Sequence, residues 1–335
     1  MKKGAPPGAP RFPPMDALAS PQPDTRPRPP SRRWPDVSFR LLALLAAFTI
    51  AALIVLVGLE LYRGGRLSVA QFGPGFLVKS RWDPVSDVYG ALPFIYGTLV
   101  SSAIALLIAV PLGVATALFL TEMAPLPIRQ PVITIIEMLA AVPSVIFGLW
   151  GIFVLVPWLR DHCFRWLRAW LGFLPLFSGP IYGVGMLAAG IIVAIMILPI
   201  VTSVSREILR SVPNLQREAA YALGATHWET IRIAVLSYAR RGIFGAAVLG
   251  LGRALGETMA VTMVIGNRPE ISASLFAPGY TLASVIANEF TEATSDLYLS
   301  SLFELGLVLL AITLLVNAIA QLMLRTLTGG ASGRT

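Results

Sequence analysis

The sequence predicts an all-α membrane protein with six transmembrane helices. Of its 335 residues, 56% are hydrophobic and 13% are charged, whereas soluble domains carry about 25% charged residues. The apolar residues gather in long blocks, and a helix of about 20 apolar residues spans the hydrocarbon core of a bilayer. Six such blocks occur, at residues 41–62, 94–121, 132–157, 182–204, 243–265 and 303–324.

The segment before the first block is rich in Pro and Arg. Such a segment cannot bury enough apolar surface to offset the entropy of ordering, so residues 1–38 are predicted to form a disordered cytoplasmic tail. A cleaved signal peptide is not expected, because the tail is long and no small-residue cleavage site follows the first block. The membrane domain is then residues 39–327, with a long loop at 205–242, and residues 328–335 form a second short tail.

The distribution of basic residues predicts the orientation. The net charge is +8, but the basic residues are spread over the tail and loops without the aromatic interleaving of a nucleic-acid site, so nucleic acid is not an expected partner. With the N-terminus inside, 17 of the 26 Lys and Arg residues lie on the inner side and eight on the outer side. The positive-inside rule therefore predicts that both termini are cytoplasmic, and much of the bias comes from the tail and the 205–242 loop.

The sequence contains no pattern typical of an enzyme. Cys163 is the single cysteine, and the two histidines, His162 and His227, form no Cys/His cluster with metal-ligand spacing. No Gly-x-x-x-x-Gly-Lys-Ser/Thr loop occurs, so the chain is not expected to hydrolyse ATP itself. We therefore expect no metal, no cofactor and no catalytic residue in this chain.

The loop at 205–242 is predicted to form two short helices joined by a turn. Pro213 suits the first turn of a helix, and Gly224 suits the left-handed position after its end. Apolar residues recur between them at helical spacing: Leu215, Ala219, Ala222 and Leu223. Thr226 and Glu229 have the spacing of a capping box, so a second helix is expected to begin there.

This loop resembles the coupling loop of type I ABC importer permeases. The hallmark of that family is Glu-Ala-Ala, three residues, Gly, nine residues, then Ile-x-Leu-Pro. The chain has Glu218, Ala219 and Ala220 with Gly224 at the right offset, but it departs at 234–237, where it reads Ala-Val-Leu-Ser. The resemblance implies the MetI-like six-helix fold and an elbow that docks on a cytoplasmic ATPase. An ordinary amphipathic hairpin is the alternative interpretation.

Two membrane blocks resemble the PstC family of phosphate-specific permeases. Residues 251–261 read Leu-Gly-Arg-Ala-Leu-Gly-Glu-Thr-Met-Ala-Val and closely resemble its fifth span, and residues 140–149 resemble the third span that this family shares with its partner PstA. The resemblance covers residues 40–325 and implies the permease subunit of an ATP-driven phosphate importer, forming half of the translocation path. The alternatives are a permease for molybdate or sulfate and, in another class, an ion-coupled secondary transporter.

The same resemblance implies the partners and the location. The chain would sit in a bacterial cell membrane as a heterodimer with a PstA-like permease. Two copies of a PstB-like ATPase would bind ATP and Mg, and a PstS-like protein outside would deliver phosphate. On the elbow, Thr226 and Trp228 would join the motif residues in contacting the ATPase.

A charged pair lies inside the fifth block. Arg253 and Glu257 are four residues apart, so they are predicted to share a helix face. A charge at bilayer depth costs about 2.5–3.5 kcal/mol, so each should face a cavity or a partner. In one interpretation the two neutralise each other. In the other, Arg253 binds the oxyanion transiently, while Glu257 limits its retention and accepts a hydrogen bond from the P–OH of hydrogen phosphate.

Further polar and small residues accompany this pair. Thr258 is a candidate for the same path, and four other hydroxyl residues share that expectation: Thr98, Ser101, Ser102 and Thr262. Gly252 and Gly256 would let another helix approach closely. Glu137, near the inner end of the third block, is expected to pair with a basic residue.

Overall fold

The computed structural model describes residues 33–329 and gives side chains for residues 37–324. The predicted disordered tail lies almost wholly outside the described residues, and the first helix, α1 (Arg33–Phe72), begins within its last part. The chain divides into two units, Met1–Leu56 and Val57–Thr335, and the packed core belongs to the second. In the described range the structure is helical, and its only β feature is an isolated bridge between Asp83 and Val88.

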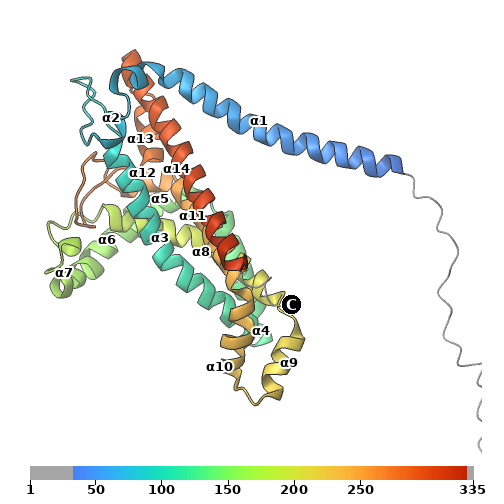
Figure 1. Ribbon diagram of the computed structural model, residues 1–335. Helices are drawn as coiled ribbons and strands as arrows, with labels where there is room; N and C mark the ends of the chain where they lie inside the picture. Colours follow the sequence, from blue (N-terminus) through green and yellow to red (C-terminus); the bar gives the residue numbers. More distant parts are fainter. Residues whose placement is uncertain (1–32, 330–335) are drawn as a thin grey trace, which may run out of the picture. The chain divides into compact units, whose positions relative to one another are not determined.

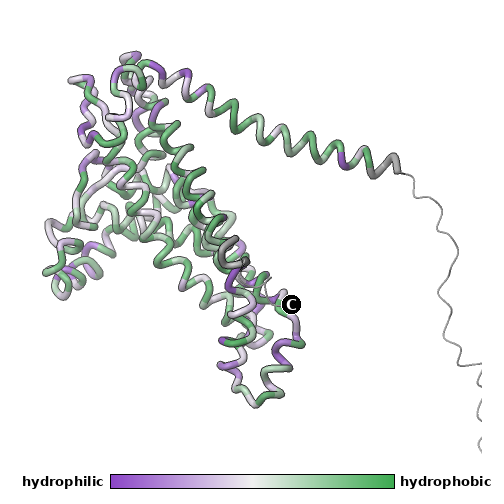
Figure 2. Tube along the Cα trace, viewed as in Figure 1, coloured by the Kyte–Doolittle hydropathy of each residue, from purple (hydrophilic) through white to green (hydrophobic). Residues whose placement is uncertain are grey.

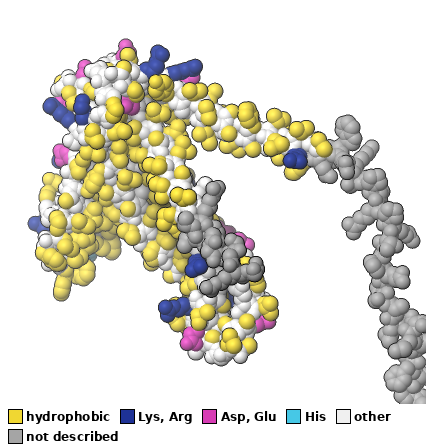
Figure 3. All heavy atoms as spheres, viewed as in Figure 1, with side chains coloured by type: hydrophobic (Ala, Val, Ile, Leu, Met, Phe, Trp, Pro, Cys, Tyr) yellow, Lys and Arg dark blue, Asp and Glu magenta, His cyan; other side chains and the backbone are white. Residues whose placement is uncertain are grey.

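Six helices in the described part of the chain are long and apolar enough to cross a membrane, which confirms the predicted number (Figure 1). They cover Val37–Phe72, Leu92–Met123, Ser144–Leu171, Met186–Arg210, His227–Leu255 and Asp296–Leu324. Hydrophobic residues run along these helices, and hydrophilic residues concentrate toward their ends and in the loops (Figure 2). On the visible face of the second unit, hydrophobic side chains cover the flanks of the helices (Figure 3).

The third spanning helix differs from its predicted range. The apolar block 132–157 is split at Pro143, which separates α4 (Leu126–Ala141) from α5 (Ser144–Trp150). Proline lacks an amide hydrogen and forces the preceding residue to be extended, and Val142 accordingly has ψ 128°. The spanning helix therefore starts at Ser144 and continues through two π-helical turns and α6 (Val156–Trp158) to the end of α7 (Arg165–Leu171).

The fifth spanning helix also differs, because it begins and ends earlier than predicted. It runs from α10 (His227–Thr230) through the π-helical turn η6 (Ile231–Leu236) into α11 (Ser237–Leu255). Three arginines lower the hydropathy of the first part of this helix: Arg232, Arg240 and Arg241. For this reason the apolar block in the sequence begins only at residue 243. The chain then breaks at residues 256–258 and resumes as the short helix α12 (Met259–Val264).

The core forms around α8 (Met186–Arg210). This helix packs along α3 (Leu92–Leu118) and α11, and 61% of its most apolar 18-residue stretch is buried. Small residues line the packed surfaces of α3 and α8, including Ala105, Ala109, Ala188, Ala189 and Ala194. Helices in a bilayer associate through such close van der Waals packing, because lipid tails are as apolar as the side chains and the hydrophobic effect does not drive the helices together.

One glycine allows a loop to cross α3 at close range. A Cβ placed on Gly97 would lie 2.0 Å from the carbonyl oxygen of Tyr280. Next to it, the Thr98 hydroxyl accepts a hydrogen bond from the backbone amide of Leu282, the first residue of α13 (Leu282–Glu289), at 2.9 Å. The segment before α13 is therefore fixed against the start of α3.

Candidate functional site

The predicted elbow is present as α9 (Asn214–Ala222), a turn and α10. Pro213 stands at the N-cap, one position before the predicted first turn. Gly224 has φ +82°, which confirms the left-handed turn. The Ala225 amide donates to the Ala220 carbonyl at 3.1 Å and the Gly224 amide to the Tyr221 carbonyl at 2.9 Å, so the turn closes α9 as a Schellman motif.

The second helix of the elbow begins with the predicted capping box. The Thr226 hydroxyl accepts from the Glu229 amide at 3.4 Å, and the Glu229 carboxylate accepts from the Thr226 amide at 2.8 Å. This helix is not short, because α10 continues through η6 into α11. The elbow is therefore directly continuous with the fifth spanning helix.

The elbow exposes the residues of its motif. Glu218, Ala219, Gly224, Thr226 and Trp228 are exposed, and Ala220 is half-buried. Large apolar side chains are exposed with them: Leu215, Leu223, Trp228 and Ile233. Leu215, Leu223 and Trp228 belong to the elbow and Ile233 to η6 just after it, and exposed apolar side chains gathered in this way are typical of a protein-docking surface.

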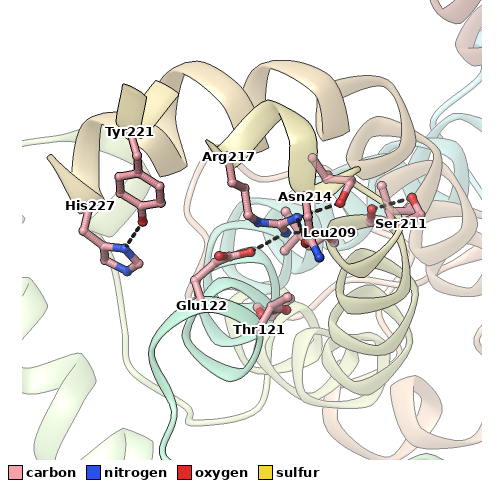
Figure 4. A network of polar contacts seen from close by, with 11 residues as sticks. Thr121, Glu122, Leu209, Ser211, Asn214, Arg217, Tyr221 and His227 are labelled. Atoms are coloured by element: carbon pink, nitrogen blue, oxygen red, sulfur yellow. Dashed lines mark hydrogen bonds and ion pairs between the residues drawn. The ribbon is translucent and has the colours of Figure 1, made fainter. Parts of the chain in front are cut away.

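The base of the elbow holds an ion pair that was not predicted from the sequence (Figure 4). Arg217 of α9 contacts Glu122, which lies in the π-helical turn η2 (Phe119–Met123) at the end of α3, with 2.9 Å between Nη2 and Oε1. At the tip of the elbow, the Tyr221 hydroxyl and His227 Nδ1 are 2.8 Å apart. The elbow is thus held together by a contact of its own at the tip and is joined at its base to the end of α3, the second spanning helix.

The charged pair of the fifth block is arranged differently from the prediction. The expectation that Arg253 and Glu257 share one helix face is wrong, because α11 ends at Leu255. Arg253 is exposed in the last turn of α11, whereas Glu257 lies in the break and is only 9% exposed. No ion pair joins the two within the described residues. The sequence signal for the break was the Gly256 at the end of the apolar helix.

The surroundings of the break are partly open. A Cβ atom added to Gly252 would have no neighbour within 4 Å. A Cβ atom added to Gly256 would have one, the carbonyl oxygen of Gly252 at 3.8 Å. The Thr258 hydroxyl donates to the Gly256 carbonyl at 3.2 Å, and Thr262 donates to the Thr258 carbonyl at 2.8 Å. Gly252 lies in the last turn of α11 and Gly256 lies just beyond its end, so the two do not form the expected continuous helix face, although no other part of the described chain packs against either glycine.

Of the remaining predicted polar residues on α3, two hydroxyls are bonded to their own helix. Thr98 donates to the Phe94 carbonyl and Ser101 to the Gly97 carbonyl, each at 2.7 Å. The Ser102 hydroxyl is buried and has no hydrogen-bond partner among the described side chains and backbone. Glu137 pairs with Arg206 of α8 at 3.4 Å, which confirms its predicted partner type.

A half-buried carboxylate with contacts that were not predicted lies at the opposite end from the elbow. Glu289, at the end of α13, accepts hydrogen bonds from Trp82 Nε1 at 2.8 Å and from the Tyr298 hydroxyl at 2.7 Å. Burial raises the pKa of the Glu289 carboxyl above its usual value, and these two hydrogen bonds partly oppose the rise. Trp82 and Tyr89 stack edge to face beside it, with ring centroids 4.9 Å apart.

The described residues hold no group of three or more His, Cys, Asp or Glu side chains placed to bind a metal ion. Residues 109–329 match the family model described as binding-protein-dependent transport system inner membrane component. Among solved structures, a bacterial ABC transporter involved in the import of the acidic polysaccharide alginate aligns with a TM-score of 0.53 at 19% identity. The alignment covers 89% of this chain and 100% of that one, and it supports the fold alone.

Curated relatives are much more similar in sequence. The phosphate transport system permease protein PstC of Mesorhizobium japonicum is 48% identical over 293 residues, covering 86% of this chain and 90% of the relative. The PstC protein of Haemophilus influenzae is 45% identical over 298 residues, covering 88% and 94%. The chain therefore belongs to the binding-protein-dependent transport system inner membrane components and, within them, to the family of PstC permeases.

Proposed function

We propose that this chain is the permease subunit of an ATP-driven importer of inorganic phosphate in a bacterial cell membrane. The observation that carries the proposal is the 48% identity to a phosphate transport permease over 86% of the chain. Its partners would be a second, PstA-like permease, two PstB-like ATPase subunits that bind ATP and Mg, and a PstS-like phosphate-binding protein outside.

The elbow is the proposed docking site for the ATPase, at the cytoplasmic end of the helices. Its support is the exposed Glu218–Gly224 motif on a turn that is closed by hydrogen bonds at both helix ends. Trp228 and Leu223 offer apolar contact area, and α10 leads without interruption into the fifth spanning helix. Closure of the ATPases would therefore act directly on that helix.

The break in the fifth helix is the proposed substrate path. Arg253 is exposed beside two glycines against which nothing in the described chain packs, so the second permease can approach there. A guanidinium matches the geometry of phosphate oxygens with paired hydrogen bonds. The Glu257 carboxylate would accept from the P–OH of hydrogen phosphate, a proton that sulfate lacks, and Thr258 would add a hydroxyl.

Uptake by cells tests this function. Cells lacking the chain should lose phosphate uptake and regain it when the chain is restored. The restored uptake should survive collapse of the proton gradient and stop on ATP depletion. Uptake that follows the proton gradient instead would indicate a secondary transporter, and restored uptake of sulfate or molybdate in place of phosphate would contradict the substrate.

A further inference from the structure

The base of the elbow concentrates several contacts on one side chain. The Arg217 guanidinium contacts the Glu122 carboxylate at 2.9 Å, and the two side chains are only 18% and 10% exposed. The same guanidinium donates to the Val212 carbonyl at 2.6 Å and to the Leu209 carbonyl at 3.2 Å. These carbonyls lie at and just beyond the end of α8, and the Leu209 carbonyl also accepts from the Val212 amide at 3.4 Å.

Arg217 thus joins three elements at one point (Figure 4). It belongs to α9, Leu209 belongs to α8, and Glu122 belongs to the π-helical turn that ends α3. An apolar cluster from α3, α8, η6 and α11 lies in the same region: Ala117, Leu209, Val212, Val235 and Ala239. A displacement of α9 is therefore passed to α3 through a charged contact and to α8 through its last carbonyls.

A second ion pair, between Glu137 and Arg206, is more exposed to solvent than the Glu122–Arg217 pair. Glu137 of α4 contacts Arg206 of α8 at 3.4 Å, but the Glu137 side chain is 58% exposed. Solvent screens such a pair, so it contributes little to holding two elements together. The Glu122–Arg217 pair is largely shielded from solvent, and it reaches the elbow, which the Glu137–Arg206 pair does not.

We propose that Glu122 and Arg217 are positioning residues that transmit movement of the docked elbow to α3 and α8. The proposal rests on the proposed function, because it assumes that an ATPase moves the elbow. In this mechanism α11 receives the movement directly through α10, while α3 and α8 receive it through Arg217. The Glu122–Arg217 pair makes α3 and α8 move together with α11, so that each cycle of ATP hydrolysis opens the substrate path once.

The test is the number of ATP molecules hydrolysed per phosphate imported by the complete purified complex in proteoliposomes. Glu122→Gln keeps the size of the side chain and an acceptor oxygen but removes the charge, and Arg217→Gln removes the guanidinium. We expect each variant to bind the ATPase normally. Glu122→Gln should raise this ratio about tenfold, the factor expected from removing the charge assistance of one hydrogen bond, and Arg217→Gln should raise it at least as much, because it also removes the hydrogen bonds to the Val212 and Leu209 carbonyls. The double variant should be no worse than the poorer single variant, because the two residues act as a unit.

Two controls separate coupling from folding. Glu137→Gln removes the exposed carboxylate of the Glu137–Arg206 pair and should leave the ratio at the wild-type value. If a single variant assembles poorly, Glu122→Asp and the double variant carry the test, since neither leaves a buried charge alone. The proposal would be overturned if the assembled variants hydrolysed the same number of ATP molecules per imported phosphate as the wild type. It would also be overturned if the variants differed from the wild type only in the amount of complex formed. Absence of ATP-driven uptake by the wild-type complex would instead contradict the proposed function.

Discussion

Gly224 offers a clean test of the elbow, because a substitution there changes the backbone energy and little else. The residue has φ +82°, and an added Cβ would meet nothing within 4 Å. A left-handed conformation costs an L-residue roughly 1–2 kcal/mol, and a β-branched side chain is among the least tolerant. Gly224→Val should therefore lower the population of the native turn about 5–30-fold without any clash in the core.

Gly224→Asn is the matched control, because asparagine tolerates the left-handed region while adding a side chain of similar size. The assay is titration of the purified ATPase onto the permease heterodimer in lipid nanodiscs, with uptake measured in parallel. We expect Val to weaken ATPase binding about 5–30-fold and Asn to stay near wild type. Equal affinity for the Val and Asn variants would refute the backbone argument, whether both bind normally or both bind poorly.

Three further predictions concern the proposed substrate path, the packing of α3 at Gly97, and Glu289 at the end of the protein opposite the elbow. Arg253→Gln should lower uptake steeply, and Arg253→Lys should retain part of it. The double variant with Glu257→Gln should stay inactive in uptake assays, because no ion pair joins Arg253 and Glu257 within the described residues, whereas recovery of uptake would assign the two side chains to packing alone. Gly97→Ala should lower the stability of the detergent-solubilised protein by about 1–3 kcal/mol in thermal unfolding, because its Cβ would lie 2.0 Å from the Tyr280 carbonyl oxygen; an unchanged melting temperature would contradict the close approach. Burial raises the pKa of Glu289, so the folded state binds its proton more tightly than the unfolded state, and stability should fall as the pH rises from the ordinary carboxyl range through that raised pKa. Glu289→Gln should flatten this dependence in melting curves, and an equally steep dependence in the variant would exclude Glu289 as its source.

The features predicted correctly from the sequence were those with local signals. The elbow follows from Gly224 at a left-handed turn and from the spacing of Thr226 and Glu229, which are contacts within a few residues. The number of spanning helices follows from apolar blocks alone. Family membership follows from a contiguous stretch, residues 251–261, that is similar to PstC permeases.

The predictions failed where hydropathy and backbone geometry disagree. The predicted third helix runs across Pro143 because its apolar block continues on both sides, although proline ends the hydrogen-bond ladder there. The spacing of four residues between Arg253 and Glu257 predicts one helix face, but it carries no information on the break at Gly256. The Glu122–Arg217 pair joins residues 95 positions apart, so no local pattern indicated it.

The most direct test of the central claim is phosphate accumulation by the complete complex in proteoliposomes, with the binding protein outside and ATP available to the ATPase. We predict accumulation that requires this chain, ATP hydrolysis and the binding protein, and that excess sulfate does not inhibit. Accumulation driven by a proton gradient without ATP, or transport of sulfate at the rate of phosphate, would contradict the account.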